Sequence, residues 1–200
     1  MDTVFVTGPI GSGKSAVCAL LQRRGIPVYD SDRRAKALYS PSLVARLEEA
    51  LGTTLSTPDG SLDAPRLSAL IFSSSEARQT LEGILYPLVR EDFIRWREEQ
   101  NPSVPFVVLE SAVILSKKEF DGLANRVVLV TAPEAVRLRR VVARSGLTPG
   151  QVLDRMSAQQ IPEDDPRIDA VICNTGSRED LADAVKRAFK LDENSLPLYR

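Results

Sequence analysis

The sequence predicts an α/β fold in which helices flank a doubly wound, five-stranded parallel sheet. Two observations predict it. Short runs of apolar and β-branched residues alternate with longer helical stretches, and several of the runs are apolar throughout. Continuous apolar runs are typical of parallel strands that are buried on both faces. Because 200 residues is the size of one domain, we expect a single core with an insertion.

Short apolar runs place the five expected strands along the chain. The first three lie at residues 3–7, 27–30 and 106–109, and the last two lie at 127–130 and 170–173. The runs 106–109 and 127–130 contain only Val, Leu and Phe, so we expect both to be buried parallel strands.

Helical patterns separate these strands. Residues 14–24 form the first expected helix, which Gly25 would terminate because glycine readily adopts the left-handed conformation of a C-terminal cap. A second helical pattern covers 33–38, and 179–190 is expected to form the closing helix.

One long stretch lacks any strand pattern. Between residues 62 and 96 the apolar residues recur at helical spacing, which indicates an inserted helical lobe. The expected single domain therefore has three parts: a core of about 1–40, 103–135 and 168–190, a helical lobe of about 41–100, and a helical lid of about 136–167.

The composition is that of an ordinary soluble protein and excludes several chemistries. With 43% apolar residues, 26% charged residues and a net charge of -1, nothing demands nucleic acid or a membrane surface as a partner. The chain contains no histidine, which removes imidazole bases, Ser-His-Asp triads and His-ligated zinc. A carboxylate or a lysine is therefore the expected proton acceptor.

The cysteines and the start of the sequence bear on the cellular compartment. Cys18 and Cys173 are far apart in sequence and flanked by apolar residues, so both are expected to be reduced, buried thiols of a cytoplasmic protein. The sequence begins without a basic segment or a long apolar stretch, so neither a signal peptide nor a membrane span is expected.

A phosphate-binding motif follows the first expected strand. Residues 8–15 fit G-x-x-x-x-G-K-[ST] and lie between an expected strand and an expected helix, as a P-loop requires. Glycines let the backbone fold around phosphate oxygens, and the helix adds the positive end of its dipole. Lys14 is expected to reach the β- and γ-phosphates, and the Ser15 hydroxyl to bind Mg²⁺. The residues expected to bind ATP here are Gly8, Gly11, Ser12, Gly13, Lys14, Ser15 and Ala16.

Acidic residues follow two of the expected strands. Asp30 and Asp32 come after the second strand, at the edge where ligands of open α/β sheets collect. Asp32 is the expected base for a hydroxyl proton, and Asp30 is expected to be structural or to face the metal through water; either one alternatively caps the next helix. Glu110 ends the third strand, where it either faces the substrate and the metal waters or is an ordinary strand-end acid.

Three arginines share one face of the helix expected after Pro133. Arg137, Arg140 and Arg144 are three and four residues apart, so they lie on one side. They form either a solvated face or a set of phosphate ligands, since the guanidinium fork suits phosphate oxygens. Gly146 follows them and, with a nearby proline, indicates a hinge for a lid that excludes water.

Taken together, these motifs resemble the dephospho-coenzyme A kinases over the whole chain. Residues 7–15 are similar to T-G-G-I-G-S-G-K-S of that family, and residues 25–32 to its G-x-x-V-I-D-A-D. Residues 81–87 correspond to L-E-x-I-L-H-P, and Asp169 to Asn174 resembles A-D-x-V-I-x-N. The P-loop alone is common to many NTPases, but this combination is much narrower.

The resemblance implies a role for each matching position. It implies that Asp32 is the base, that Lys14 and Arg140 act in catalysis, and that the helical lobe binds the coenzyme through Tyr86 and Pro87. A further set is implied at the nucleotide and in the lid: Asn174 near adenine, Arg140 and Arg144 as lid arginines, and Arg155 with Gln159 as another lid element.

Three departures from the family pattern stand out. Pro9 replaces a loop glycine, which is tolerated where no inward N–H is needed. Tyr86 stands where histidine is usual, so a phenol must make that substrate contact. Residues 112–116 lack the proline and glutamate of the family segment P-L-L-F-E.

The predicted function is transfer of the γ-phosphate from Mg·ATP to the ribose 3′-hydroxyl of dephospho-CoA, in the cytoplasm, with these two small molecules as partners. One alternative is another P-loop kinase of a small metabolite or nucleoside monophosphate. A second is a switch protein or regulatory module that binds nucleotide without turnover. A GTP switch needs an N-K-x-D motif, and residues 174–177 are Asn-Thr-Gly-Ser.

Overall fold

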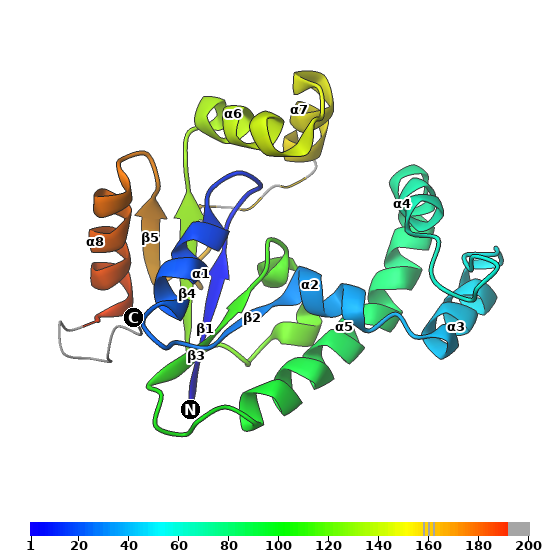
Figure 1. The fold of residues 1–200 in the computed structure, drawn as a ribbon, viewed down its shortest axis with the longest axis horizontal. Helices are drawn as coiled ribbons and strands as arrows, with labels where there is room; N and C mark the ends of the chain where they lie inside the picture. Colours follow the sequence, from blue (N-terminus) through cyan, green and yellow to red (C-terminus); the bar gives the residue numbers. More distant parts are fainter. Residues whose placement is uncertain (158, 160, 162, 192–200) are drawn as a thin grey trace. The chain divides into compact units, whose positions relative to one another are not determined.

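A computed structural model describes residues 1–157, 159, 161 and 163–191, and within them five parallel strands form one sheet (Figure 1). The strand order is β2-β3-β1-β4-β5. The strands are β1 (Asp2–Thr7), β2 (Val28–Asp30), β3 (Phe106–Glu110), β4 (Arg126–Thr131) and β5 (Ala170–Cys173). The predicted doubly wound α/β sheet is confirmed, and each expected strand lies within two residues of its predicted bounds.

The central strands are buried because their apolar side chains meet protein on both faces. Val107, Val108 and Leu109 of β3 are fully buried, as are Val128 and Leu129 of β4. All neighbouring strands run parallel, so their carboxyl ends share one edge. Functional side chains placed at strand ends are therefore brought together at that edge.

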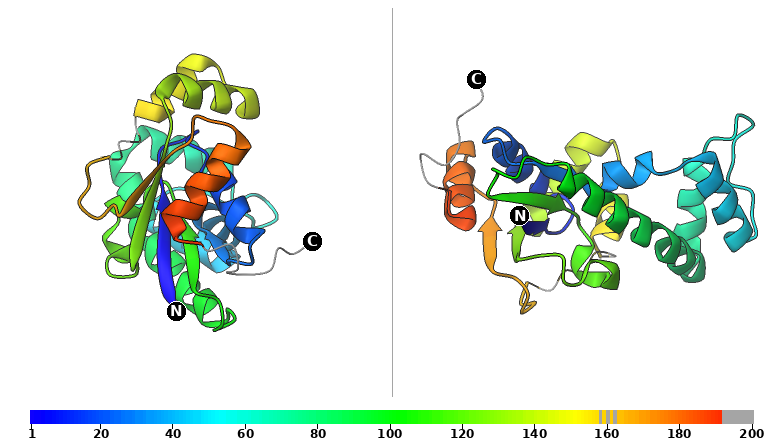
Figure 2. Two further views of the ribbon diagram at one scale, coloured as in Figure 1. Left: turned by 90° about the vertical axis from the view of Figure 1, so that its left-hand side faces the viewer. Right: turned by 90° about the horizontal axis from the view of Figure 1, so that it is seen from below.

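Two helices cover one face of the sheet. Helix α1 (Lys14–Gln22) and helix α8 (Arg178–Phe189) pack side by side there (Figures 1 and 2). Alternate strand residues such as Val4 and Val6 point into this core together with Leu21 of α1 and Val185 of α8. Phe5 lies on the opposite face, where the single turns η1 (Ile114–Ser116) and η2 (Lys118–Phe120) contribute buried side chains.

The two cysteines differ in exposure, and the expectation for one of them is wrong. Cys18 is buried in α1, but Cys173 is exposed, and both are free thiols. Cys173 lies on β5, which is an edge strand, and Val171 of the same strand is 53% exposed. An apolar sequence pattern cannot distinguish an edge strand with one open face from a central strand.

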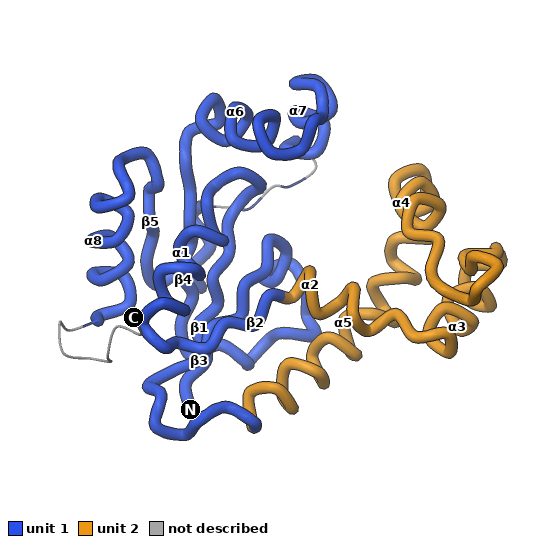
Figure 3. The backbone as a smooth tube through the Cα atoms, viewed as in Figure 1, with its two compact units in different colours: residues 1–30, 99–200 blue, residues 31–98 orange. Residues whose placement is uncertain are grey.

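Residues 31–98 form a second compact unit made of helices, whereas residues 1–30 and 99–200 form the first (Figure 3). The helical unit has its own core around Val44, Leu47, Leu55 and Leu67. Its helices are α2 (Ser31–Ala37), α3 (Pro41–Leu51), α4 (Ala64–Ser73) and α5 (Ser75–Glu98). The unit begins at Ser31, earlier than the lobe outlined from sequence, so α2 belongs to it.

The remaining helices of the first unit are α6 (Glu134–Ser145) and α7 (Pro149–Ser157). They are joined through Gly146, which caps α6 in the left-handed conformation with φ 68°. Among the helices of the described ranges, none combines the length and the apolar character needed to cross a bilayer.

Candidate active site

The loop from Gly8 to Ser15 connects β1 to α1, and its glycines are required by close backbone approaches. Gly8 and Gly13 have φ of 147° and 100°. A Cβ added to Gly8 would lie 2.0 Å from the Val130 carbonyl oxygen, and one added to Gly13 would lie 2.0 Å from Asn174 Nδ2. Because glycine has no side chain, the loop can lie close to β4 and to the end of β5, and no larger residue fits at either position.

Lys14 lies at the start of α1, between the loop and the end of β3. Its Nζ donates a hydrogen bond of 2.8 Å to the Gly8 carbonyl and lies 3.9 Å from Glu110 Oε1. Asp30 is the register partner of Glu110 on β2, so two carboxylates end neighbouring strands. Burial, and next the charge of Glu110, raises the pKa of the nearby Cys18 thiol, which therefore stays protonated.

Two buried hydroxyl groups at the loop lack a hydrogen-bond partner within the described part of the chain. They are Thr7 Oγ1 and Ser12 Oγ, and both residues are almost fully buried. Such groups are costly to leave unpaired unless water or a ligand completes them. Ser12 is among the residues predicted to bind ATP, whereas Thr7 is not. The sequence signal for Thr7 is its position at the end of β1, directly before the motif.

Helices α6 and α7, which lie in the range predicted to form the lid, pack against the phosphate loop. Ile10 of the loop joins the apolar cluster of Val141 and Val152. The Ile10 amide also donates a 2.8 Å hydrogen bond to Gln159 Oε1, which lies beyond α7. The two helices and the segment after them are thus attached to the loop by both apolar and polar contacts.

Arg140 connects α6 to both the loop and β5. Its Nη1 donates to the carbonyls of Gly11 and Ser12 at 3.4 and 3.3 Å, and its Nη2 donates to the Asn174 carbonyl at 3.0 Å. Arg137 lies on the same side, with a 3.0 Å bond from Nε to the Ala132 carbonyl. Arg144 is exposed, one turn further along α6.

A cavity of about 310 Å³ opens beside the phosphate loop. Buried Asn174 borders it and donates from Nδ2 to the Ser12 carbonyl at 2.9 Å. The residues that line the cavity come from the loop, α6 and the start of α8: Gly11, Gly13, Ser15, Ala16, Arg140, Arg144, Asn174, Gly176, Ser177, Arg178 and Leu181. Positive side chains and the N-terminus of α8 converge there, which suits an anionic ligand.

Four lining residues, Gly176, Ser177, Arg178 and Leu181, are outside the set predicted from sequence. Ser177 and Asp180 form a capping box, with the Ser177 amide donating to Asp180 at 2.8 Å and the Asp180 amide donating to Ser177 Oγ at 3.1 Å. The S-x-x-D pattern is the sequence signal for this helix start and thus for the end of the cavity.

The helical unit holds three more of the predicted site residues. Asp32 is exposed in the first turn of α2. Tyr86 and Pro87 are neighbours within α5, which continues through Pro87; Tyr86 is half-buried and Pro87 is exposed. Within the phosphate-loop unit, in contrast, the structure brings together Lys14 and Glu110.

The oxygen ligands near the loop suit Mg²⁺. Ser15 supplies a hydroxyl on the cavity wall, and Glu110 and Asp30 supply carboxylates at adjacent strand ends. Across the described ranges, no three His, Cys, Asp or Glu side chains are grouped to hold a metal by themselves. Mg²⁺ usually keeps several waters and shares its ligands with substrate phosphates, so this donor set fits a metal that is bound together with the nucleotide.

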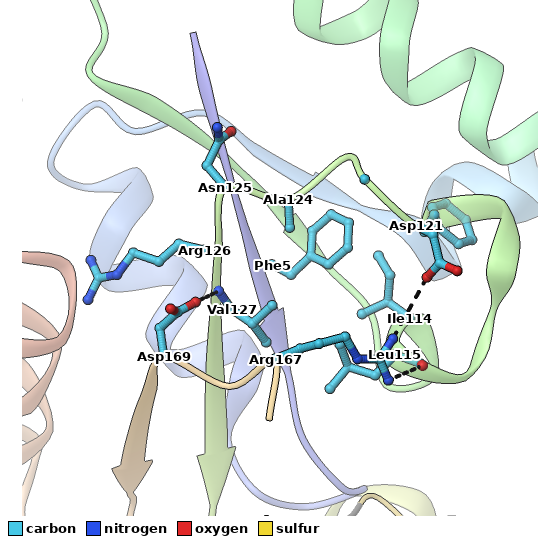
Figure 4. Close-up of a pocket in the computed structure, with 12 residues that line it drawn as sticks. Phe5, Ile114, Leu115, Asp121, Ala124, Asn125, Arg126, Val127, Arg167 and Asp169 are labelled. Carbon is cyan, nitrogen blue, oxygen red and sulfur yellow. Dashed lines mark hydrogen bonds and ion pairs between the residues drawn. The ribbon is translucent and has the colours of Figure 1, made fainter. Parts of the chain in front are cut away.

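A second cavity, of about 250 Å³, lies near the amino ends of β4 and β5 (Figure 4). Beside it, Arg167 binds Asp165 through bonds of 2.9 and 2.7 Å and donates to the Leu115 carbonyl at 2.6 Å. Hydrogen bonding to Arg167 lowers the pKa of Asp165 to about 2. Arg167 thereby attaches the segment that follows the lid to the loop that follows β3.

Comparison with known proteins agrees with this geometry. The family model described as dephospho-CoA kinase matches residues 3–180. The dephospho-CoA kinase of Porphyromonas gingivalis is 41% identical over 162 residues, which are 80% of this chain and 78% of that protein. The enzyme of Thiobacillus denitrificans is 36% identical and covers 98% of this chain and 100% of its own length. The crystal structure of TT1252 from Thermus thermophilus has a TM-score of 0.80 at 36% identity, over 96% of this chain and 98% of that one.

Proposed function

The chain belongs to the dephospho-CoA kinase family, and from this premise we propose how its own residues transfer the γ-phosphate of ATP to the ribose 3′-hydroxyl of dephospho-CoA. ATP and dephospho-CoA are its substrates. The observation that supports the assignment is the phosphate loop, with Lys14 beside Glu110 and a cavity bordered by Arg140 and Asn174.

ATP binds with its phosphates in the loop and its base in the adjoining cavity. The amides of Gly11 and Gly13 point toward the phosphates, and Lys14 exchanges the Gly8 carbonyl for the β- and γ-phosphate oxygens. Ser12 and Ala16 contribute to the same cradle. Asn174 and its loop lie next to adenine.

The Ser15 hydroxyl would hold magnesium together with ATP, and Glu110 or Asp30 would act through water. When bound, the metal would offset the negative charge that develops during transfer. Glu110 also faces the acceptor.

Asp32 accepts the proton of the 3′-hydroxyl. It is exposed and therefore accessible to a substrate, and the chain has no histidine that could do this work. Tyr86 and Pro87 bind the acceptor on α5, with the Tyr86 phenol in the position for which the family pattern has histidine.

Arginines of the lid complete the site. Arg140 now binds carbonyl groups of the loop and of Asn174, and it exchanges them for γ-phosphate oxygens when ATP enters. Arg144 is exposed on the cavity wall and binds phosphate as well. Because phosphoryl transfer has a loose transition state, positioning and charge stabilisation supply most of the catalysis.

The enzyme works in the cytoplasm, with neither nucleic acid nor membrane as a partner. A reducing compartment suits the two free cysteines, one of which is exposed. The net charge of -1 gives no general attraction to polyanions.

Replacing the proposed base tests the assignment. We expect Asp32→Asn to lower kcat for dephospho-CoA phosphorylation by about a hundredfold, within the range of general-base catalysis, while the dissociation constant for ATP changes little. The measurement is ADP release with and without dephospho-CoA, beside several nucleosides as acceptors, together with an ATP titration.

Lys14→Ala is the comparison variant, because it removes the phosphate contact and should abolish both acceptor phosphorylation and slow ATP hydrolysis. Near-normal turnover in Asp32→Asn would exclude Asp32 as the base. ADP release that does not respond to dephospho-CoA in the unaltered enzyme would contradict the proposed reaction itself.

A further inference from the structure

Helix α2, which carries Asp32, has little apolar surface with which to stay in place. Its sequence is Ser-Asp-Arg-Arg-Ala-Lys-Ala, and Ser31, which is 7% exposed, is its one buried residue. A helix of seven residues is not stable by itself in water, so it depends on tertiary contacts. Leu38 and Tyr39, which follow it, pack against the core of the helical unit and fix its far end.

A two-pronged ion pair fixes the middle of α2 to α5. Arg34 Nε donates to Asp92 Oδ2 at 2.8 Å, and Arg34 Nη2 donates to Asp92 Oδ1 at 2.7 Å. Asp92 is only 8% exposed although it is charged. Two parallel hydrogen bonds of this kind set the angle between the partners as well as their separation.

We propose that Arg34 and Asp92 are positioning residues that hold Asp32 in the orientation needed to take the proton from the acceptor hydroxyl. The proposal rests on the role of Asp32 proposed above. Arg34 is two residues from Asp32 on the same short helix, and Asp92 lies in the helix that carries Tyr86 and Pro87. The pair therefore fixes the position of the base relative to the residues that bind the acceptor.

Stability alone does not account for such a pair. Taking the Asp92 carboxylate out of water costs part of what its attraction to Arg34 returns, although the Arg34 side chain is 38% exposed, and apolar side chains of similar size often stabilise as well. A bidentate Arg–carboxylate contact adds a defined geometry that apolar packing lacks. Orientation matters for catalysis, since a displacement of about 1 Å can cost about a hundredfold in rate.

The test separates positioning from folding. We expect Asp92→Asn to lower kcat for dephospho-CoA about tenfold, with an unchanged KM for ATP, because the fork is lost while the residue keeps its size. The double variant Arg34→Met with Asp92→Leu should keep its melting temperature within a few degrees and lose at least as much kcat. Glu91→Gln, an exposed neighbour on α5, is the matched control and should retain full kcat.

The decisive readout is the same substitution in an Asp32→Asn background. If Asp92 acts by positioning Asp32, Asp92→Asn should cost less than about twofold there, because no carboxylate remains to be positioned. An equal tenfold loss in both backgrounds would overturn the proposal, as would full kcat in Asp92→Asn. A kcat that does not depend on Asp32 would also overturn it. Failure of the proposed reaction is distinguishable, because ADP release by the unaltered enzyme would then not depend on dephospho-CoA.

Discussion

At the scale of single residues, the phosphate loop is shaped by contacts between residues far apart in sequence. Asn174 donates to the Ser12 carbonyl, although 162 positions separate the two residues. The same side chain occupies the space in which Gly13 would place a Cβ. Gly13 is therefore required for two reasons: its positive φ and the closeness of Asn174.

Gly13→Ala should weaken ATP binding by roughly tenfold or more, since relieving the clash must displace Asn174 or the loop, at a cost on the order of 1–3 kcal/mol. An ATP titration measures the effect. Gly25→Ala is the matched control: Gly25 also has a positive φ, but nothing lies within 4 Å of an added Cβ. It should lose some stability and keep its affinity for ATP. Equal affinities in the two variants would contradict the role given to Asn174.

At the scale of elements, the segment that follows α7 is held to the sheet and to the phosphate loop by hydrogen bonds. Gln159 binds the loop amide of Ile10, and Glu163 accepts from Thr131 Oγ1 at 2.8 Å at the end of β4. Further along, Arg167 in the segment before β5 binds Asp165 and donates a hydrogen bond to the Leu115 carbonyl, which holds this segment to η1. Gly146 caps α6 in the left-handed conformation, and the lid hinge predicted there from sequence stays a prediction.

The Arg167–Asp165 contact should be visible as a pH effect. Because the pKa of Asp165 is lowered to about 2 in the folded protein, the contact stabilises the fold fully at pH values above the unfolded-state pKa of about 4. This stabilisation is lost as the pH falls toward about 2. In Arg167→Met the pKa of Asp165 should rise toward about 4, as measured by NMR titration.

Asp180 is the internal control for that titration, because its pKa is lowered by hydrogen bonds from Ser177. The pKa of Asp180 should not respond to Arg167→Met. It should rise only in part in Ser177→Ala, because the Ser177 backbone amide, the larger cause, still donates to Asp180. If the pKa of Asp165 stayed near 2 without Arg167, another group would be responsible.

At the scale of the whole molecule, each of the two compact units has a hydrophobic core of its own. Leu21 is fully buried in the core on the sheet, and Leu47 is fully buried in the core of the helical unit. The phosphate loop belongs to the first unit, and Tyr86 and Pro87 to the second. Damage to one core should therefore affect one substrate more than the other.

Leu47→Ala should destabilise the helical unit by about 2–5 kcal/mol and raise KM for dephospho-CoA, while the affinity for ATP is unchanged. Leu21→Ala, an identical substitution in the other core, should weaken ATP binding instead. Hydrogen exchange measures both effects by segment, with loss of protection confined to residues 31–98 in the first variant. Loss of protection across both units in each variant would show that they unfold together.

Features encoded by neighbouring residues could be predicted from sequence. The strands, α1 and the phosphate loop follow from apolar runs and from the spacing of glycines before Lys14 and Ser15. The loop motif sits between β1 and α1 as expected. Such features depend on backbone preferences within about ten residues, so a single sequence is sufficient.

Only the tertiary structure decided which distant polar residues contact each other and which elements are exposed at an edge. The sequence contains Arg34 and Asp92, but their spacing does not show that they bind each other, nor that Arg140 binds the carbonyls of the loop. The burial expected for Cys173 failed because strand order, and not composition, makes β5 an edge strand. Which polar residues bind each other depends on which elements pack together, and the local pattern of apolar residues does not contain that information.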